Sequence, residues 1–495
     1  MVVVMKDIFH AGWSGMFLLT ASSCAWKASP AAPPLQSAVQ QVEAAYDQLP
    51  DALPAYNAAM REVCREMEVH GIPVVTEELR RMNISFVSPP GDLKITHIRV
   101  AAATSTTSNS EAGAPIVIQY EVPPQSHYPP EGLFVNGTAV YEKTGGGARV
   151  VIHTGGGRIR IGQRSYDAAM DPVAAGDHLN RLSGKLGGSG FINMIRPLGS
   201  SRKPRVYLLD PYDPEKIPLL MVHGLQSTPL AFAELVKSLR REPEFRKRYQ
   251  IWQFHYASGT PVLVNAVSLR ASLNEVISTL DPQGRSVACK RIVIVGHSMG
   301  GVISHTLVSS SGEKVWSSIF KVPASRLEGD PEAVRNLHQI LHFKRDSRIS
   351  KVIFMAAPHR GSPTSLSFIG MTGNLVTRLS AMEEHRFTAL ARRNEASMTN
   401  AAAEFYNGGR FSAVRTLSPR SPALVAVSKL PIEVPFHSII GQKKAGRIED
   451  GSDGVVPYWS SHLDGARSEK IVRSGHGIIS NPEAVAEVKR ILLSN

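Results

Sequence analysis

The 495-residue sequence is poor in cysteine, with only Cys24, Cys64 and Cys289. Their positions lack the short spacing of zinc-binding cysteines, so a cysteine zinc site is excluded. If Cys24 is consumed in processing, the remaining pair is far apart in sequence, and we do not expect a disulfide between its members.

The N-terminal apolar run, Ile8 to Ser23, is too short to cross a bilayer. It follows Lys6 and ends in small residues, which is typical of a secretory signal peptide. The segment ending at Cys24 resembles a bacterial lipobox, although Ala21 stands where leucine is usual. We therefore expect residues 1–24 to be a signal peptide and Cys24 to be lipidated, which would anchor the protein in the cell envelope. Plain secretion and a cytoplasmic location are the alternatives.

Acidic residues are outnumbered by basic ones, and the net charge is +13. A basic surface can attract a membrane or a nucleic acid, but these cations are scattered along the sequence. The densest clusters, Arg240-Arg241 and Arg246-Lys247-Arg248, lack the interleaved aromatic and glycine residues of nucleic-acid modules. We favour a solvated basic exterior and expect no nucleic-acid partner. With 43% hydrophobic and 20% charged residues, the chain has the composition of a globular protein.

The first two fifths of the chain carry no catalytic pattern. Residues 25–35 are rich in Ala, Ser and Pro and are expected to form a flexible tether. Residues 36–70 have apolar side chains at helical spacing, interrupted by two prolines, which predicts two helices. Short β-type runs separated by turn residues follow in residues 85–165. Residues 36–203 are therefore expected to form an accessory region of helices and then short strands.

From residue 204 onward, strand and helix patterns alternate. Strands are predicted at Val206–Leu209, Leu219–Val222, Gln250–Tyr256, Ile292–Val295, Lys351–Met355 and Phe436–Ile440. Helices are predicted at Ala231–Arg240, Val264–Leu280, Ala389–Phe405 and Pro482–Leu493. This alternation predicts a mainly parallel α/β sheet with helices on both faces. Insertions at about 305–347 and 364–433 interrupt it and are expected to form lids over the carboxyl ends of the strands.

The central catalytic signal is Gly296-His297-Ser298-Met299-Gly300-Gly301. It lies between a predicted buried strand and a helical pattern, which is the setting of a Gly-x-Ser-x-Gly nucleophile elbow. The sharp turn requires small neighbours two residues on either side of Ser298, and Gly296 and Gly300 meet that requirement. The N-terminus of the following helix directs its free N–H groups toward a developing oxyanion.

A second motif, His223-Gly224-Leu225, comes directly after the strand Leu219–Val222. In a fold with this elbow, a His-Gly turn after an early strand supplies the other half of the oxyanion hole. The predicted donors are the backbone N–H groups of Leu225 and Met299.

With both motifs in this order, residues 204–495 resemble the α/β-hydrolase superfamily, in particular bacterial lipase- and esterase-like serine hydrolases. The segment from Ala357 to Ser362 is similar to a Thr-Pro-His-Arg-Gly-Ser turn of such enzymes. We interpret this turn as structural, and His359 is only a minor candidate for direct chemistry.

The resemblance implies the chain order serine, acid, histidine for the catalytic triad. His476 lies just before the last predicted helix, where the family places its base, and His462 is the nearest rival. For the acid we choose Asp453, in a Ser-Asp-Gly-Val-Val-Pro turn similar to that of many lipases. Its alternatives are Glu449, Asp450 and, more remotely, Asp464.

The segment Ser460 to Leu463 is similar to one in secreted lipases that hold structural calcium. Those lipases carry an acidic residue two positions after the catalytic histidine, where this sequence has Ile478. We therefore expect no metal and no cofactor.

The resemblance implies cleavage of carboxylic esters through an acyl-enzyme, with a lipid or small-molecule ester as substrate. An amidase, a thioesterase or an acyltransferase would use the same triad. A non-catalytic binding protein of the cell envelope is the alternative from another class. The sequence does not identify the acyl length, the oligomeric state or the role of residues 36–203.

Overall fold

The computed structural model describes residues 33–89, 91–101, 110–182, 203–363, 388–407 and 413–494. The expected signal peptide and Cys24 lie outside these ranges, so lipidation and envelope anchoring stay predictions. Helix α1 begins at Pro33, which corrects the expected tether: its last three residues are helical. Proline is well tolerated in the first turn of a helix because its missing N–H has no intrahelical partner there.

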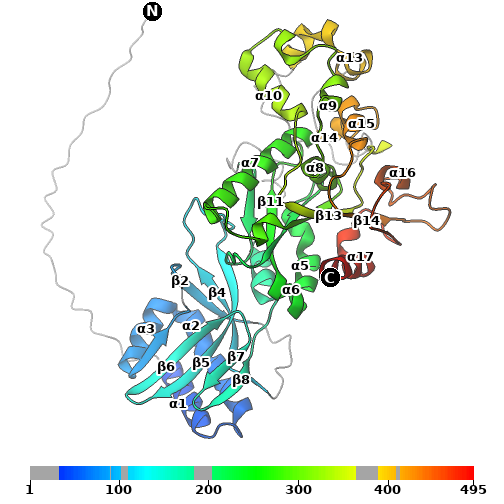
Figure 1. Ribbon diagram of the computed structural model, residues 1–495. Helices are drawn as coiled ribbons and strands as arrows, with labels where there is room; N and C mark the ends of the chain where they lie inside the picture. Colours follow the sequence, from blue (N-terminus) through cyan, green and yellow to red (C-terminus); the bar gives the residue numbers. More distant parts are fainter. Residues whose placement is uncertain are drawn as a thin grey trace, which may run out of the picture.

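The N-terminal region combines helices with two small sheets (Figure 1). Its first helices are α1 (Pro33–Asp47), α2 (Leu53–His70) and α3 (Ile72–Arg81), the last of which the sequence patterns did not predict. Residues 174–182, after the strands, are helical as well. One sheet has the order β1-β6-β5-β4-β2 and the other the order β3-β8-β7. The strands are β1 (Ile84–Val87), β2 (Ile95–Val100), β3 (Glu111–Ala112), β4 (Ala114–Tyr120), β5 (Leu133–Thr144), β6 (Gly147–Thr154), β7 (Arg158–Ile161) and β8 (Arg164–Ala168).

Helix α2 is joined to the sheets by buried polar groups as well as by apolar packing. The Tyr56 hydroxyl donates to the carbonyl oxygen of Tyr141 and accepts from its N–H, both at 2.8 Å. Asn57 donates to the Glu111 carbonyl and accepts from the Gly113 N–H. Since every buried polar atom in these four contacts has a partner, the contacts specify how α2 lies on the strands.

The larger part of the chain forms a seven-stranded sheet of order β15-β14-β13-β12-β10-β11-β9. All neighbours are parallel except the edge pair β9–β11, so the predicted mainly parallel sheet is confirmed. The strands are β9 (Arg205–Leu208), β10 (Ile217–Val222), β11 (Tyr249–His255), β12 (Ile292–His297), β13 (Ile349–Met355), β14 (Phe436–Gly441) and β15 (Ser468–Val472).

Helices cover both faces of this sheet. On one face lie α7 (Val262–Leu280) and α8 (Met299–Leu307), and on the other α5 (Ala233–Arg241), α6 (Pro243–Arg248) and α17 (Pro482–Leu493). The central strand β12 contributes to both cores: Ile292 and Ile294 pack with α7 and α8, whereas Val293 and Val295 pack with α5 and α17. This explains why its sequence is continuously apolar rather than alternating.

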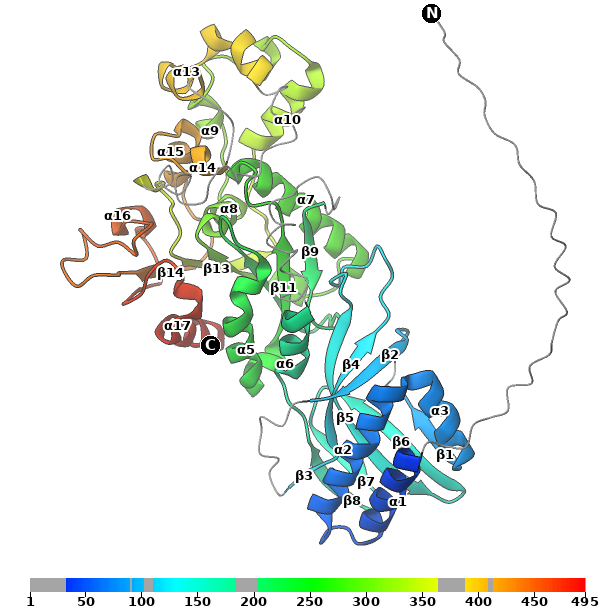
Figure 2. The same cartoon turned by 180° about the vertical axis from the view of Figure 1, so that it is seen from behind.

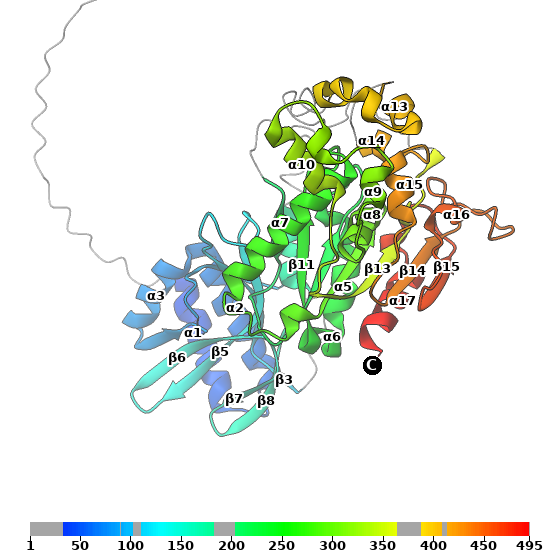
Figure 3. The same cartoon turned by 45° about the horizontal axis from the view of Figure 1, so that its top comes forward.

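Two insertions stand at one end of the molecule, above α7 and α8 (Figures 1 and 3). Their helices include α9 (Lys314–Ser317), α10 (Pro331–Leu341), α13 (Asn400–Asn407), α14 (Ala413–Thr416) and α15 (Pro422–Ser428), and residues 388–393 are also helical. The first insertion begins later than expected, because α8 continues to Leu307. The single helix expected at Ala389–Phe405 is instead two pieces, since the residues between 393 and 400 form a turn and a short 3-10 helix.

The two regions of the chain are in contact at strand β9, on the side seen in Figure 2. The Leu208 N–H donates to the His127 carbonyl at 2.7 Å, so the N-terminal region supplies a partner to the edge of the large sheet. The backbone N–H of Tyr212 also donates to the Tyr128 hydroxyl. Pairing of this kind protects an edge strand that would otherwise expose unpaired backbone groups.

Cys64 and Cys289 are both buried and free, as expected from their separation in sequence. None of the helices within the described ranges combines the length and the hydropathy needed to cross a bilayer.

Candidate active site

Ser298 occupies the sharp turn between β12 and α8, with φ 52° and ψ −127°. This left-handed conformation is strained for a residue with a side chain. A hydrogen bond of 2.9 Å from its N–H to the Met355 carbonyl of β13 holds the turn in place. Such a turn projects the serine hydroxyl from the carboxyl end of the strand, as the elbow motif predicts.

The glycines of the motif are required by close backbone approach. A Cβ on Gly300 would lie 2.1 Å from the Val222 carbonyl oxygen, and one on Gly296 would lie 2.7 Å from the Ser304 hydroxyl. A Cβ on Gly301 would meet the side chain of Ala357 at 2.4 Å. The elbow helix therefore starts in direct contact with the end of β10, which brings the two oxyanion-hole motifs together.

The structure brings Ser298, His476 and Asp453 into one hydrogen-bonded chain. His476 Nε2 lies 2.8 Å from Ser298 Oγ, and His476 Nδ1 lies 2.7 Å from Asp453 Oδ2. The imidazole can thus accept the serine proton on one nitrogen while the carboxylate orients the other, which is the geometry of a catalytic triad.

Asp453 is only 3% exposed, and its second carboxylate oxygen is also occupied. Asp453 Oδ1 accepts the backbone N–H groups of Val455 and Val456 at 2.8 and 2.7 Å. Gly454 has φ +94°, which allows the chain to fold back so that both N–H groups face the carboxylate. The tight turn that the sequence showed after Asp453 is therefore what fixes its orientation toward His476.

The turn from Ala357 to Ser362 supports the acid loop. The Ser362 hydroxyl donates to the Val455 carbonyl, and the Ser460 hydroxyl donates to the Gly361 carbonyl at 2.6 Å. The Arg360 side chain donates to the His462 carbonyl at 2.7 Å. This turn thus has contacts that suit the structural role expected of it.

His359 lies in the core, with its Nδ1 3.2 Å from Nδ1 of His305. Burial lowers the pKa of His305 to about 4 and lowers that of His359 well below its ordinary value. One neutral imidazole must donate to the other, so the pair is a hydrogen-bonded part of the core at neutral pH.

The rival candidates lie elsewhere. His462 contacts Glu469 and Asp464 at 2.6 and 3.3 Å at the surface. Glu449 and Asp450 are exposed and face Arg447. Among the described residues, no cluster of His, Cys, Asp and Glu is arranged to hold a metal ion.

The His223-Gly224-Leu225 turn lies against the nucleophile. A Cβ on Gly224 would be 2.8 Å from the Ser298 Cβ, so glycine lets the loop approach the serine closely. Two hydrogen bonds to residues that follow β11 hold this loop in place: the Gln226 N–H donates to the Ser258 hydroxyl at 3.0 Å, and the Tyr256 hydroxyl donates to the His223 carbonyl. This position places Leu225 beside the elbow, where its N–H and that of Met299 are the candidate oxyanion donors.

His297 is a buried neighbour of the candidate triad that the sequence patterns did not single out. Its ring is buried, and its Nε2 lies 2.9 Å from the backbone carbonyl of His476. Burial lowers the pKa of His297 to about 3, so the ring is neutral at physiological pH. A neutral ring with Nε2–H donates to that carbonyl and so links the elbow to the loop of the catalytic base.

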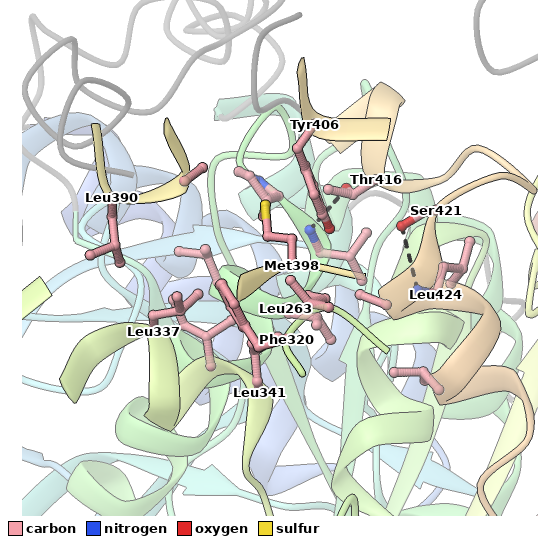
Figure 4. A pocket seen from close by; sticks show the side chains of 18 of the residues that line it. Leu263, Phe320, Leu337, Leu341, Leu390, Met398, Tyr406, Thr416, Ser421 and Leu424 are labelled. Carbon is pink, nitrogen blue, oxygen red and sulfur yellow. Dashed lines mark hydrogen bonds between the residues drawn. The ribbon is translucent and has the colours of Figure 1, made fainter. Parts of the chain in front are cut away.

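An apolar cavity lies between α7, α8 and the insertions (Figure 4). Leu337 and Leu341 of α10 point into it, as do Phe320 and Met398 from two other segments. Val302, four residues after Ser298 on α8, forms part of its wall, about 6 Å along the helix axis from the nucleophile. Ser298, His476 and Asp453 are not among its lining residues, so the cavity lies beside Ser298 rather than around it.

Sheet order, elbow and triad together decide the architecture. Residues 205–493 have the α/β-hydrolase fold. The expected fold class is thereby confirmed, and the N-terminal region is an addition to it. No protein-family model matches the chain, and no curated protein sequence does.

Solved structures with weak overall similarity include several hydrolases. The mature lipase BlEst2 of Bacillus licheniformis is 16% identical, with 59% of this chain and 98% of that chain covered and a TM-score of 0.35. The Staphylococcus hyicus lipase is 13% identical, with 57% and 94% covered and a TM-score of 0.35. A thioesterase domain from the curacin biosynthetic pathway is 15% identical, with 59% and 100% covered and a TM-score of 0.29. Similarity at this level carries no argument about the activity of this chain.

We predict that His297 positions the catalytic base. Replacing it with leucine removes the donor to the His476 carbonyl and should lower kcat by about 10- to 100-fold, because small misplacements of a base are costly. KM should change little. His297→Gln, which retains an N–H donor, should recover part of the rate. A lower rate could come from a misplaced base or from a smaller folded fraction of the variant. Active-site titration with a fluorophosphonate separates these two explanations: if only the folded fraction is smaller, kcat per titrated site will equal that of the wild type.

A second prediction concerns acid stability. Burial lowers the pKa of His223 to about 3 and that of His305 to about 4, whereas histidine in an unfolded chain titrates near 6.5. Between these pH values the unfolded chain binds more protons than the folded chain. The free energy of unfolding is therefore unaffected by these histidines above about pH 6.5 and decreases as the pH falls below that value. Each such histidine should lower the unfolding free energy by about 1.4 kcal/mol per pH unit in this window.

Urea unfolding at pH 7, 6 and 5 measures this slope. The slope should be smaller in His305→Gln than in the wild type, because the pKa of His305 is lowered by burial. Equal slopes in wild type and His305→Gln would contradict the assignment.

Proposed function

We propose that this chain is a serine hydrolase that cleaves carboxylic esters through an acyl-enzyme. The observation that carries the proposal is the continuous chain from Ser298 through His476 to Asp453, at 2.8 and 2.7 Å. A serine hydroxyl is a weak nucleophile on its own, and this arrangement supplies the base that activates it.

In the first half-reaction, Ser298 Oγ attacks the ester carbonyl carbon while His476 Nε2 takes the hydroxyl proton. Asp453 stabilises the imidazolium that forms. The backbone N–H groups of Leu225 and Met299 bind the oxyanion, and each such donor lowers the barrier by about 3 kcal/mol in comparable sites. His476 then gives its proton to the alcohol oxygen as the C–O bond breaks, which leaves the acyl group on Ser298.

In the second half-reaction, water takes the place of the alcohol. His476 accepts a proton from the water as its oxygen attacks the acyl-enzyme, and the same donors bind the new oxyanion. Return of the proton to Ser298 Oγ releases the carboxylic acid and restores the enzyme.

The apolar cavity supports an ester with an aliphatic acyl group. Its few polar side chains already have partners: Thr416 accepts from the Val262 N–H, and Ser421 accepts from the Leu424 N–H. A ligand there gains mainly from burial of hydrocarbon, about 0.8 kcal/mol per CH₂. A thioester or amide with the same acyl group would fit the same serine, so the leaving group has to be determined by measurement.

The proposed nucleophile is tested by fluorophosphonate labelling of the wild type, Ser298→Ala and Asp453→Asn. Labelling should be absent in Ser298→Ala. Hydrolysis of p-nitrophenyl butyrate should fall by about three to four orders of magnitude in Asp453→Asn, because the imidazole loses its orienting charge. Ser278→Ala, at an exposed serine of α7, is the matched control. Labelling that persists in Ser298→Ala would overturn the assignment.

The proposed acyl site is tested by filling part of the apolar cavity with a larger side chain. Leu263→Trp replaces an aliphatic side chain of the cavity wall with a larger indole ring. The kcat/KM for p-nitrophenyl octanoate should then fall about tenfold or more, while the kcat/KM for p-nitrophenyl acetate stays near that of the wild type. Leu263→Met conserves the volume and should leave both values close to the wild type. An equal loss on both substrates would show that the cavity does not receive the acyl chain.

A further inference from the structure

The peptide between Gly224 and Leu225 carries a candidate oxyanion donor, and the carbonyl at its other end has a hydrogen-bond partner. His223 Nδ1 lies 3.0 Å from the Gly224 carbonyl oxygen. Because a carbonyl oxygen only accepts, Nδ1 carries a hydrogen and donates it. This peptide is trans, so its carbonyl and its N–H point in opposite directions. A hydrogen bond that fixes the Gly224 carbonyl therefore also fixes the direction of the Leu225 N–H.

This peptide needs a restraint because of the residue that begins it. Gly224 has no room for a side chain, since a Cβ there would lie 2.8 Å from Ser298 Cβ and 3.3 Å from His297 Nδ1. Glycine is also the residue that restricts its own backbone angles least, so it does not decide by itself which way the next peptide faces. The close approach to Ser298 thus leaves the direction of the donor open, and the hydrogen bond from the His223 ring supplies the missing restraint.

The His223 ring is itself held in place. It is buried and stacks on the ring of Tyr256, with the two centroids 4.1 Å apart and the planes inclined by 17°. The Tyr256 hydroxyl donates to the backbone carbonyl of His223, so one tyrosine contacts both the ring and the main chain of this histidine. Tyr256 stacks in turn on Phe254 of β11, at 4.9 Å, which connects the arrangement to the sheet.

The protonation state of His223 suits a permanent donor. Burial lowers the pKa of its ring to about 3, so the ring stays neutral in the physiological range. With the hydrogen on Nδ1, a neutral ring has a bare Nε2, and within the described ranges Nε2 has no hydrogen-bond partner. In the same part of the chain the Leu225 N–H has no acceptor, as a donor that serves an oxyanion requires.

We propose that His223 is a positioning residue of the oxyanion hole. By donating to the Gly224 carbonyl, it keeps the Leu225 N–H directed at the space beside Ser298. The inference rests on the proposed function, because an oxyanion forms only if Ser298 attacks a carbonyl carbon. His223 itself touches no substrate and transfers no proton. Its contact should therefore matter for stabilisation of the transition state and little for binding of the substrate.

Three substitutions of His223 separate the position of the donor from its presence. The side-chain N–H of asparagine can occupy the place of Nδ1, whereas that of glutamine reaches the place of Nε2, and leucine has no donor. With p-nitrophenyl butyrate, kcat should fall about 10- to 100-fold in His223→Gln and His223→Leu, with KM within about threefold of the wild type. His223→Asn should recover most of this loss.

A transition-state analogue provides the second measurement. A trifluoromethyl ketone adds to Ser298 Oγ and forms an adduct with a negatively charged oxygen, so its Ki should rise in His223→Gln and His223→Leu by about the factor by which kcat falls. The control is His127→Asn, which alters another buried histidine at the contact between the two regions of the chain. Its kcat per fluorophosphonate-titrated site should equal that of the wild type.

Two kinetic results would overturn the inference. Unchanged kcat per titrated site in folded His223→Gln and His223→Leu would show that the ring only stabilises the fold. An equal loss in His223→Asn would show that the donor at Nδ1 is not what matters.

NMR of the imidazole nitrogens gives a result that does not depend on activity, with the His223 signals assigned by their absence in His223→Asn. We expect hydrogen on Nδ1 at neutral pH, and hydrogen on Nε2 alone would overturn the inference. Wild-type protein that a fluorophosphonate does not label would instead contradict the proposed function, and the NMR measurement would still decide whether His223 holds the Gly224 carbonyl.

Discussion

The candidate active site of this protein depends on one close approach, between the first turn of α8 and the end of β10. Gly300 fits there only because it has no side chain: a Cβ would lie 2.1 Å from one carbonyl oxygen and 2.4 Å from the next. That contact places the elbow against the His223-Gly224-Leu225 turn. As a result, Ser298 and both candidate oxyanion donors lie just beyond the ends of two neighbouring strands, and the parallel hydrogen bonds of the sheet determine the relative position of these strands.

The candidate acid and base come from the loops after β14 and β15, on the opposite side of β12 from β10, and hydrogen bonds that involve backbone groups hold both loops. Asp453 is oriented by two N–H groups of its own turn, and that turn is hydrogen-bonded to Ser362. The His476 loop is tied to the elbow through the ring of His297. Preorganisation of this kind holds the hydroxyl, the imidazole and the carboxylate in one geometry, as the proposed reaction requires.

Sequence patterns were sufficient to predict the helices and strands whose apolar residues recur at one regular spacing. The buried strand Ile292–Val295 and the last helix Pro482–Leu493 were predicted from apolar spacing, and the structure has them. The residues chosen for chemistry, 298, 453 and 476, follow from a local motif and a known chain order, and the structure brings them within hydrogen-bond distance. Motifs work here because the strained turn restricts which residues are possible at each position.

What the sequence did not predict depends on contacts between distant segments. His297 looks like a variable position of the elbow motif, and its role becomes visible only when the His476 carbonyl, 179 residues away, is placed beside it. The helix α3 was missed because Gly71 interrupts the apolar pattern only one residue after α2 ends.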